Sequence, residues 1–174
     1  MGWVVKGDLS VARQYLGGAG TTDAALSFGG DTGNILNPVV TTEEYGSSVW
    51  ATGGDLPIAA THAPGCGTQT AALMIGGHIN ASQMGVTTVN IYNGTVWALS
   101  SNLSAFGYDF AAFGSSVAAA SCGGGAYGSA GKLTEVFNGT AWSAGGELSY
   151  DSKEHAGSGS QVTGISVGIR TESA

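Results

Sequence analysis

The four tryptophans divide the chain into units of nearly equal length. They stand at residues 3, 50, 97 and 142, so the successive intervals are 47, 47 and 45 residues. Other residues keep a constant distance from each tryptophan: a leucine follows after six residues, and glycines follow after 17 and after 26. A fixed period of this length indicates a repeat architecture, in which each unit is one supersecondary structure packed against its neighbours.

The sequence of each unit predicts four short antiparallel strands. The first is rich in small residues, as in QYLGGAG at 14–20, and the second is an apolar run followed by Gly-Gly, as in AALSF at 24–28, AALMI at 71–75 and VAAASC at 117–122. The third strand ends at Tyr45, Tyr92 or Phe137, and a turn leads into the tryptophan strand. In IYNGTVW, residues 91–97, Asn93-Gly94 predicts a two-residue type I′ turn, because both residue types accept positive φ.

Such a unit cannot bury both faces of its sheet alone, so the units must stack. Radial stacking gives a small all-β propeller, in which aromatic rings fill the wide outer spaces between blades. The sequence predicts one strand before the first unit, twelve strands in three units and two strands after them. This total is one strand short of the sixteen in a four-bladed ring. We expect a single domain over 1–174, with units at about 4–50, 51–97, 98–142 and 143–174, the last completed by 1–6. Ring closure between chains, or a larger array, is the alternative.

Charge and hydropathy exclude several classes of partner. Charged residues make up 10% of the chain and the formal net charge is −7, which opposes binding to nucleic acid. No run approaches the length of a membrane-spanning helix, so membrane insertion is not expected. The first nine residues, MGWVVKGDL, lack the pattern of a secretory signal, which leaves the localisation open between a virion and the cytoplasm. Cys66 and Cys122 lie in no CxxC pattern and are interpreted as buried free thiols.

The combination of an apolar strand ending in Gly-Gly, an aromatic residue, a tryptophan and a leucine six residues later resembles the kelch repeat over essentially the whole chain. Arg13 matches the arginine that kelch units often carry before the first strand, although Ala60, Gly107 and Ser152 replace it in the later units. TTEEYGSSVWATGGDL, residues 41–56, also resembles the tandem kelch-like arrays of uncharacterised phage and marine bacterial proteins. The resemblance implies a propeller, usually of six or seven blades, that binds through one loop face.

Two sets of residues are candidates for binding. On the loop face, the units differ most in the segments 31–40, 78–86 and 125–131, and divergent loops on a regular scaffold commonly carry specificity. The candidates there are Asp31, Asn34, His78, Asn80 and Tyr127. The alternative is that these are solvated loop residues without a ligand.

The second set lies twelve residues after each tryptophan. Equivalent positions on the innermost strands of a propeller converge at the central channel, where acidic residues and a histidine can meet and hold a cation. This channel ring consists of Tyr15, His62, Asp109 and Glu154. Alternatively, the two acidic residues lie at the solvated channel mouth and pair with Lys153 and His155.

No catalytic residue, metal ligand set or cofactor is predicted. A Ser-His-Asp triad cannot be selected from three scattered histidines, and no phosphate-binding glycine loop precedes a helix. The expected function is a non-enzymatic binding or assembly module, such as a phage-particle accessory or receptor-binding protein that engages protein or glycan. The alternatives are a structural decoration subunit of a larger assembly, with homo-oligomer contacts, and a small metal-dependent hydrolase that uses the channel ring.

Overall fold

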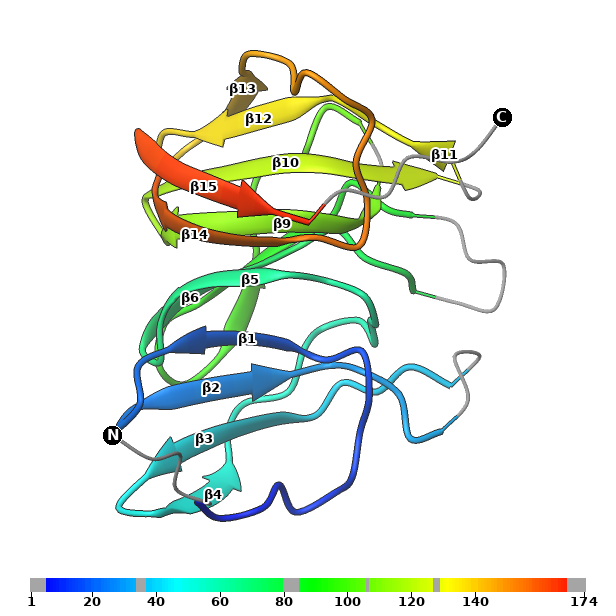
Figure 1. The fold of residues 1–174 in the computed structure, drawn as a ribbon. Helices are drawn as coiled ribbons and strands as arrows, with labels where there is room; N and C mark the ends of the chain where they lie inside the picture. Colours follow the sequence, from blue (N-terminus) through cyan, green and yellow to red (C-terminus); the bar gives the residue numbers. More distant parts are fainter. Residues whose placement is uncertain (1–5, 34–36, 80–84, 106, 127–128, 169–174) are drawn as a thin grey trace.

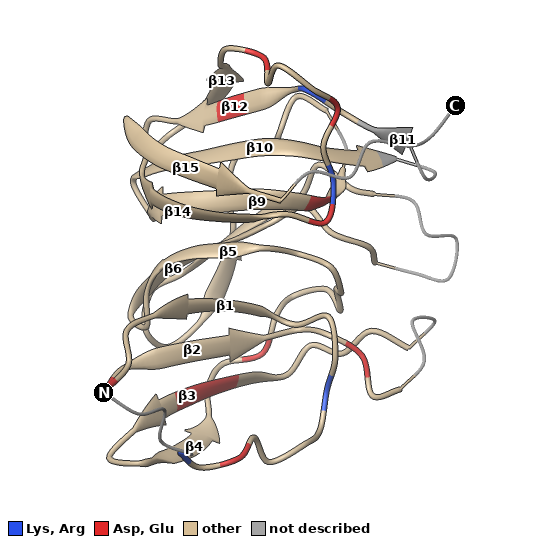
Figure 2. Ribbon diagram, in the orientation of Figure 1, with Lys and Arg blue, Asp and Glu red and all other residues tan. Residues whose placement is uncertain are grey.

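The computed structural model describes residues 6–33, 37–79, 85–105, 107–126 and 129–168 (Figure 1). Within these ranges the chain forms strands and no helix, so none of the described segments is a helix that could cross a membrane. The all-β prediction is therefore confirmed for the described residues. Most strands carry no charged residue, and the charges lie in the connections and on β3, β9 and β12 (Figure 2).

The strands form four sheets that follow one another along the chain, and each strand pairs antiparallel with the next. The first sheet contains β1 (Gly17–Gly20), β2 (Ala25–Phe28), β3 (Thr42–Gly46) and β4 (Val49–Thr52). The second contains β5 (Gly65–Thr68), β6 (Ala71–Ile75), β7 (Val89–Tyr92) and β8 (Trp97–Leu99). The third contains β9 (Tyr108–Ser115), β10 (Ala118–Ala126), β12 (Thr134–Phe137) and β13 (Trp142–Ala144), with the short β11 (Ser129–Ala130) also on β10. The fourth contains β14 (Ala156–Ser160) and β15 (Thr163–Val167).

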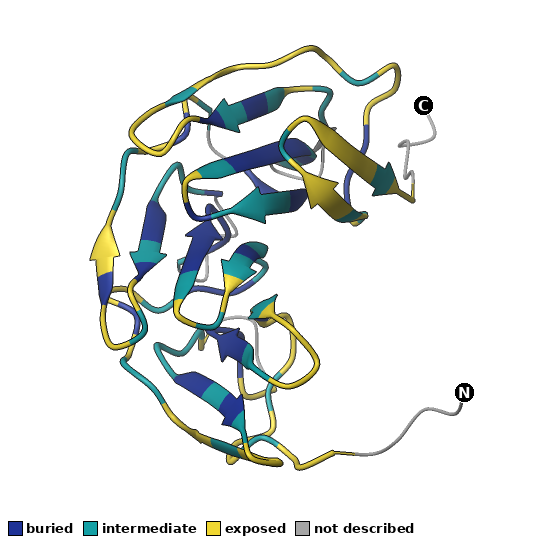
Figure 3. Ribbon diagram, turned by 90° about the vertical axis from the view of Figure 1, so that its left-hand side faces the viewer, coloured by how far each residue is buried: buried dark blue, intermediate teal, exposed yellow. Residues whose placement is uncertain are grey.

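The sheets pack face to face in an arc with the first strand of each on its inner side (Figure 3). Neighbouring first strands contact one another in the order β1, β5, β9 and β14. The predicted closed ring is not observed, because the arc stays open between the first and fourth sheets (Figure 3). Residues 1–5 and 169–174, which were predicted to close the ring, lie outside the described residues, so their pairing stays a prediction.

Apolar and aromatic side chains fill the spaces between sheets. Phe28 and Leu26 of β2 belong to the same buried cluster as Met74 and Tyr92 of the second sheet. Trp97 meets Phe28 edge to face, with ring centroids 5.0 Å apart, and donates a hydrogen bond from Nε1 to the Thr42 hydroxyl at 2.9 Å. The prediction that tyrosine and tryptophan rings lie between sheets is confirmed at this interface.

Two glutamines link neighbouring sheets in the same way. Gln69 donates from Nε2 to the carbonyl oxygens of Ala25 and Tyr45 at 3.0 and 2.7 Å. Gln161 donates to those of Ala119 and Phe137 at 3.1 and 2.6 Å. Both glutamines follow a tryptophan by 19 residues, and both tie two strands of the preceding sheet to the next one.

The predicted type I′ turn at Asn93-Gly94 is wrong. Only Gly94 has positive φ, at 90°, and four residues separate the paired Tyr92 and Trp97. The Asn93 side chain instead accepts hydrogen bonds from the backbone of Thr95 and Val96, which organises a longer turn. Positive φ at both central residues occurs in the first unit, where Ser47 and Ser48 have φ of 53° and 74° between the paired Gly46 and Val49.

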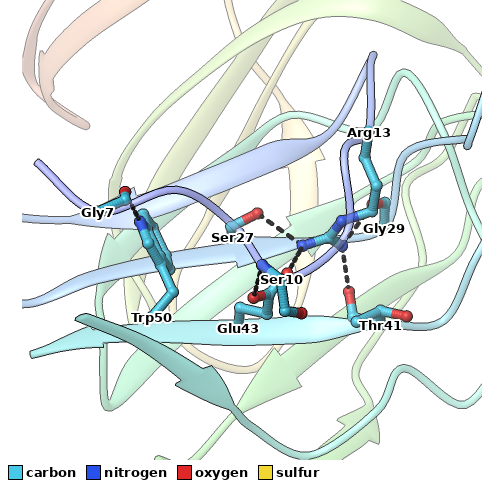
Figure 4. Close-up of polar contacts among 8 residues, drawn as sticks. All are labelled: Gly7, Ser10, Arg13, Ser27, Gly29, Thr41, Glu43 and Trp50. Carbon is cyan, nitrogen blue, oxygen red and sulfur yellow. Dashed lines mark hydrogen bonds and ion pairs between the residues drawn. The ribbon is translucent and has the colours of Figure 1, made fainter. Parts of the chain in front are cut away.

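A buried ion pair fastens the chain before β1 to the first sheet (Figure 4). The Arg13 guanidinium lies 2.8 Å from the Glu43 carboxylate, with side-chain exposures of 0% and 1%, and it also donates to the carbonyl oxygens of Gly29 and Thr41. The same carboxylate accepts the Ser10 N–H at 2.8 Å. A buried charge without its partner is costly, so this segment and the first sheet stabilise each other.

The second and third sheets keep less of this arrangement. In the third, Glu135 accepts the Ser104 N–H at 2.9 Å, as Glu43 accepts that of Ser10. In the second, Asn90 stands at the acidic position, and Pro57, which has no N–H, replaces the serine. The buried Asn90 side chain has no hydrogen-bond partner in the described part of the chain.

We predict that Arg13→Ala lowers the free energy of unfolding by about 3–5 kcal/mol, because it leaves the Glu43 carboxylate buried without its cation. Urea denaturation of both proteins measures the difference. Lys6→Ala is the matched control, since Lys6 pairs with Asp23 at the surface and should cost less than about 1 kcal/mol. Equal losses in the two variants would contradict the prediction.

Candidate functional site

Two kinds of connection lie on one side of the molecule, the right-hand side of Figure 1. One kind leads into the inner strands β1, β5 and β9, and the other leaves β2, β6 and β10 after the Gly-Gly pairs (Figure 1). We call this the loop side. It carries the channel-ring residues and the two loop-face candidates that the structure describes, Asp31 and His78.

The channel-ring residues line one hollow of about 220 Å³ on this side. Its walls are completed by apolar residues and one histidine: Leu16, Ala63, Pro64, Phe110 and His155. The structure thus brings together Tyr15, His62, Asp109 and Glu154, as the twelve-residue spacing predicts. We call this space the axial hollow.

All four ring residues have an unusual backbone conformation. Their φ values are 52° for Tyr15 and 56° for the other three, in the left-handed region that side chains rarely adopt. The backbone N–H of His62 donates to the Tyr15 carbonyl at 2.9 Å, and that of Glu154 donates to the Asp109 carbonyl at 2.8 Å. One bond joins the first unit to the second and the other joins the third to the fourth, and both help to offset the backbone strain.

The cation site that the sequence analysis considered is not assembled. Among the described residues, no three His, Cys, Asp or Glu side chains lie close enough together to hold a metal ion. The hollow combines an aromatic ring, imidazoles and two carboxyl groups instead. That combination provides a surface for stacking and groups for hydrogen bonding.

A column of four aromatic rings runs from the hollow into the protein. Tyr15 stacks on His62 with centroids 4.0 Å apart, His62 stacks on His78 at 5.0 Å, and His78 meets Tyr108 edge to face at 3.8 Å. His62 and His78 came from different candidate sets, so the column connects them. Tyr108 was not selected from the sequence.

His78 and Tyr108 are the buried members of this column. His78 is 3% exposed, and neither of its ring nitrogens has a hydrogen-bond partner in the described residues. Burial, and then the positive charge that His62 can carry, lowers the pKa of His78 to about 4. The ring is therefore neutral at physiological pH, with one nitrogen that can accept a hydrogen bond.

Asp31 occupies the equivalent position in the first unit, 28 residues after the tryptophan. It is fully buried, and its Oδ1 accepts hydrogen bonds from the Gln14 side chain and the Gly33 N–H, both at 3.0 Å. Its Oδ2 has no partner among the described residues, and the residue lines a second hollow of about 310 Å³. The remaining loop-face candidates, Asn34, Asn80 and Tyr127, lie outside the described residues.

A cysteine and a histidine meet beside the axial hollow without forming a nucleophile. Cys122 Sγ lies 3.8 Å from Nε2 of His155. Burial raises the pKa of the Cys122 thiol, a hydrogen bond from Ser166 offsets this only in part, and burial lowers the pKa of His155. The pair is neutral at pH 7, whereas cysteine catalysis needs a thiolate. Cys66 is also a free buried thiol, and burial raises its pKa to about 12.

We predict that stability falls in mild acid because of His78. Its pKa is about 4 in the folded protein against 6.5 for an ordinary histidine, so the unfolded chain binds the proton more readily between these values. This part of the stability is fully present above pH 6.5 and is lost as the pH falls toward 4. Between about pH 7.5 and 5, the loss should be about 2 kcal/mol by urea denaturation.

His78→Phe retains a ring beside Tyr108 but no proton site, so it should show less of this acid sensitivity. Some will remain, because the pKa of His155 is also lowered. An unchanged loss of stability between the two pH values in His78→Phe would show that His78 does not cause it.

Comparison with known proteins establishes the fold and no more. No protein-family model matches the chain, and no curated protein matches it. Among the solved structures that match is the structure of YjhT, with a TM-score of 0.81 and 13% sequence identity. The match covers 98% of this chain and 66% of the YjhT chain, so the chain spans about two thirds of that structure. At this identity the likeness shows that the two chains share a fold.

Proposed function

We propose that the chain is a non-enzymatic binding module that engages a protein or glycan ligand through its loop side, in a setting such as a phage particle. The observation that carries this proposal is the axial hollow, where all four channel-ring residues converge. Ligand sites are concave, largely preformed and lined by apolar and aromatic groups with a few polar ones. The lining of the axial hollow combines groups of these kinds.

The chemistry of the hollow favours a glycan. Tyr15 is 53% exposed, and its ring is held parallel to His62 by stacking. A preformed aromatic surface binds the apolar C–H face of a sugar at little cost in side-chain entropy. The carboxyl groups of Asp109 and Glu154 lie at the same hollow, where sugar hydroxyls can donate hydrogen bonds to them.

The proposal includes a kelch-like propeller in which each sheet is one blade. Its support is the spacing of the repeat, the face-to-face packing of the sheets, and the convergence of equivalent residues on the inner side of the arc. The spacing of the repeat alone favours four blades completed within one chain by the tryptophan strand at residues 1–6, whereas the exposed Ile165 and Val167 of the fourth sheet favour assembly between chains.

A structural decoration subunit is the second candidate function. The observation that favours it is the fourth sheet, where Ile165 and Val167 are exposed in the described part of the chain. The metal-dependent hydrolase has less support, because its channel ring provides no group of three ligands among the described residues.

We predict that the labelled protein binds a defined subset of glycans on an array, and that Tyr15→Ala weakens binding roughly ten-fold through loss of the stacking surface. Val117→Ala is the matched control. Val117 is also an exposed apolar residue, but it lies in the turn between β9 and β10, on the opposite side of the molecule (Figure 1). An array on which the protein binds no glycan would exclude a glycan as the ligand. Equal losses of affinity in Tyr15→Ala and Val117→Ala would show that the ligand binds outside the axial hollow.

We also predict that the melting temperature is unchanged within about 1 °C by EDTA, or by added calcium or zinc, since an ion bound only to the folded state would raise it by mass action. Differential scanning fluorimetry measures the shift. A fall on chelation that added metal reverses would support the hydrolase alternative and count against a metal-free binding module.

A further inference from the structure

The outer face of the fourth sheet exposes residues that the other units bury. Ile165 and Val167 of β15 are each 60% exposed. The residues at the same distance from the preceding tryptophans are between 0% and 6% exposed: Leu26, Leu73 and Ala120 for Ile165, and Phe28, Ile75 and Cys122 for Val167. The sequence of β15 therefore suits a covered strand, whereas the described structure leaves it open.

Strand register shows which face is open. In the first sheet, Leu26 and Phe28 point toward the second sheet and lie in one cluster with Met74 and Trp97. By the same register, Ile165 and Val167 point away from the third sheet, because Gly164, the residue before Ile165, faces Phe113 of β9. The uncovered face is the one that would meet a following sheet. β15 also pairs only with β14 in the described part of the chain, so one edge is unpaired.

The other end of the arc has the matching shape. Inside the chain, a large side chain of one sheet packs on glycines of the next: a Cβ at Gly65 would overlap the Phe28 ring, and a Cβ at Gly157 would overlap that of Phe113. Gly18 is the equivalent residue of the first sheet, and it is exposed. A Cβ there would meet only the Leu26 carbonyl oxygen, at 3.4 Å. The first sheet thus presents an unfilled glycine surface.

We propose that a second copy of this chain docks its first sheet on the fourth sheet, with Val167 against Gly18 and Ile165 against Ala25 of the partner. The contact continues the sheet-to-sheet interface that already repeats within the chain, and it covers apolar side chains and an unpaired strand edge. It is a head-to-tail contact between different surfaces, which generates a closed ring or a longer assembly. It does not depend on a glycan binding to the loop side.

Sedimentation velocity over a range of concentrations tests the proposal. The wild-type protein should associate as its concentration rises, and Ile165→Asp with Val167→Asp should weaken association roughly 100-fold, since two buried apolar groups become charged. Val162→Asp, in the exposed turn of the same sheet, is the control and should associate like the wild type. The proposal would be overturned by a wild-type protein that stays monomeric at all concentrations. It would also be overturned if the Ile165→Asp, Val167→Asp variant associates as the wild type does.

Complementation tests the head-to-tail geometry. Gly18→Leu should fold, because the position has room for a side chain, but it should block the docking face of the first sheet. Gly18→Leu alone and the Ile165→Asp, Val167→Asp variant alone should each be monomeric. An equal mixture of the two should form a dimer, because one partner keeps an intact fourth sheet and the other keeps an intact first sheet. Failure of the mixture to form a dimer would exclude this contact.

A disulfide distinguishes closure between chains from closure within one chain. Gly18→Cys combined with Val167→Cys should form covalent dimers or larger species under mild oxidation on a non-reducing gel, while Cys66 and Cys122 stay buried. A disulfide formed within a single chain would show that the arc closes on itself and would overturn the proposal.

Discussion

The contact of one sheet face with the next is the interaction on which the structure depends. A single four-stranded sheet of this size cannot bury its apolar side chains, and each interface here is formed by side chains from two units, such as Phe28 with Trp97. Polar contacts follow the same direction along the chain: Tyr92 donates to Glu44 at 2.6 Å, and Gln69 and Gln161 bind carbonyl groups of the preceding sheet. Stability is therefore shared between neighbours, and in the described part of the chain an end sheet has one such interface where an inner sheet has two.

The glycines and the aromatic residues of the repeat are two parts of this interface. A large ring enters the narrow inner space where its neighbours lack a Cβ, as with Phe28 beside its cross-strand partner Gly17 and against Gly65 of the next sheet. Glycines thus leave space for the side chains of neighbouring strands, in addition to forming turns. This explains how a chain with 31 glycines retains buried clusters on both faces of its second sheet.

Period and register could be read from the sequence, because they reflect the spacing of large and small residues that every interface requires. The four-stranded sheets and the convergence of Tyr15, His62, Asp109 and Glu154 follow from that spacing. The Asn93 turn could not be predicted correctly, since an asparagine side chain can bind the backbone as well as accept positive φ. The stacking of His62 on His78 depends on the distance between an entry segment and a loop, which no local pattern records.

The left-handed backbone of the channel ring has a consequence for how this surface can change. The four residues that adopt it are a tyrosine, a histidine, an aspartate and a glutamate, yet their φ values agree within a few degrees. The conformation therefore does not depend on which of these side chains the position carries. Mutation can exchange the chemical group delivered to the axis while the main chain stays in place, so the fold separates the evolution of recognition from the evolution of stability.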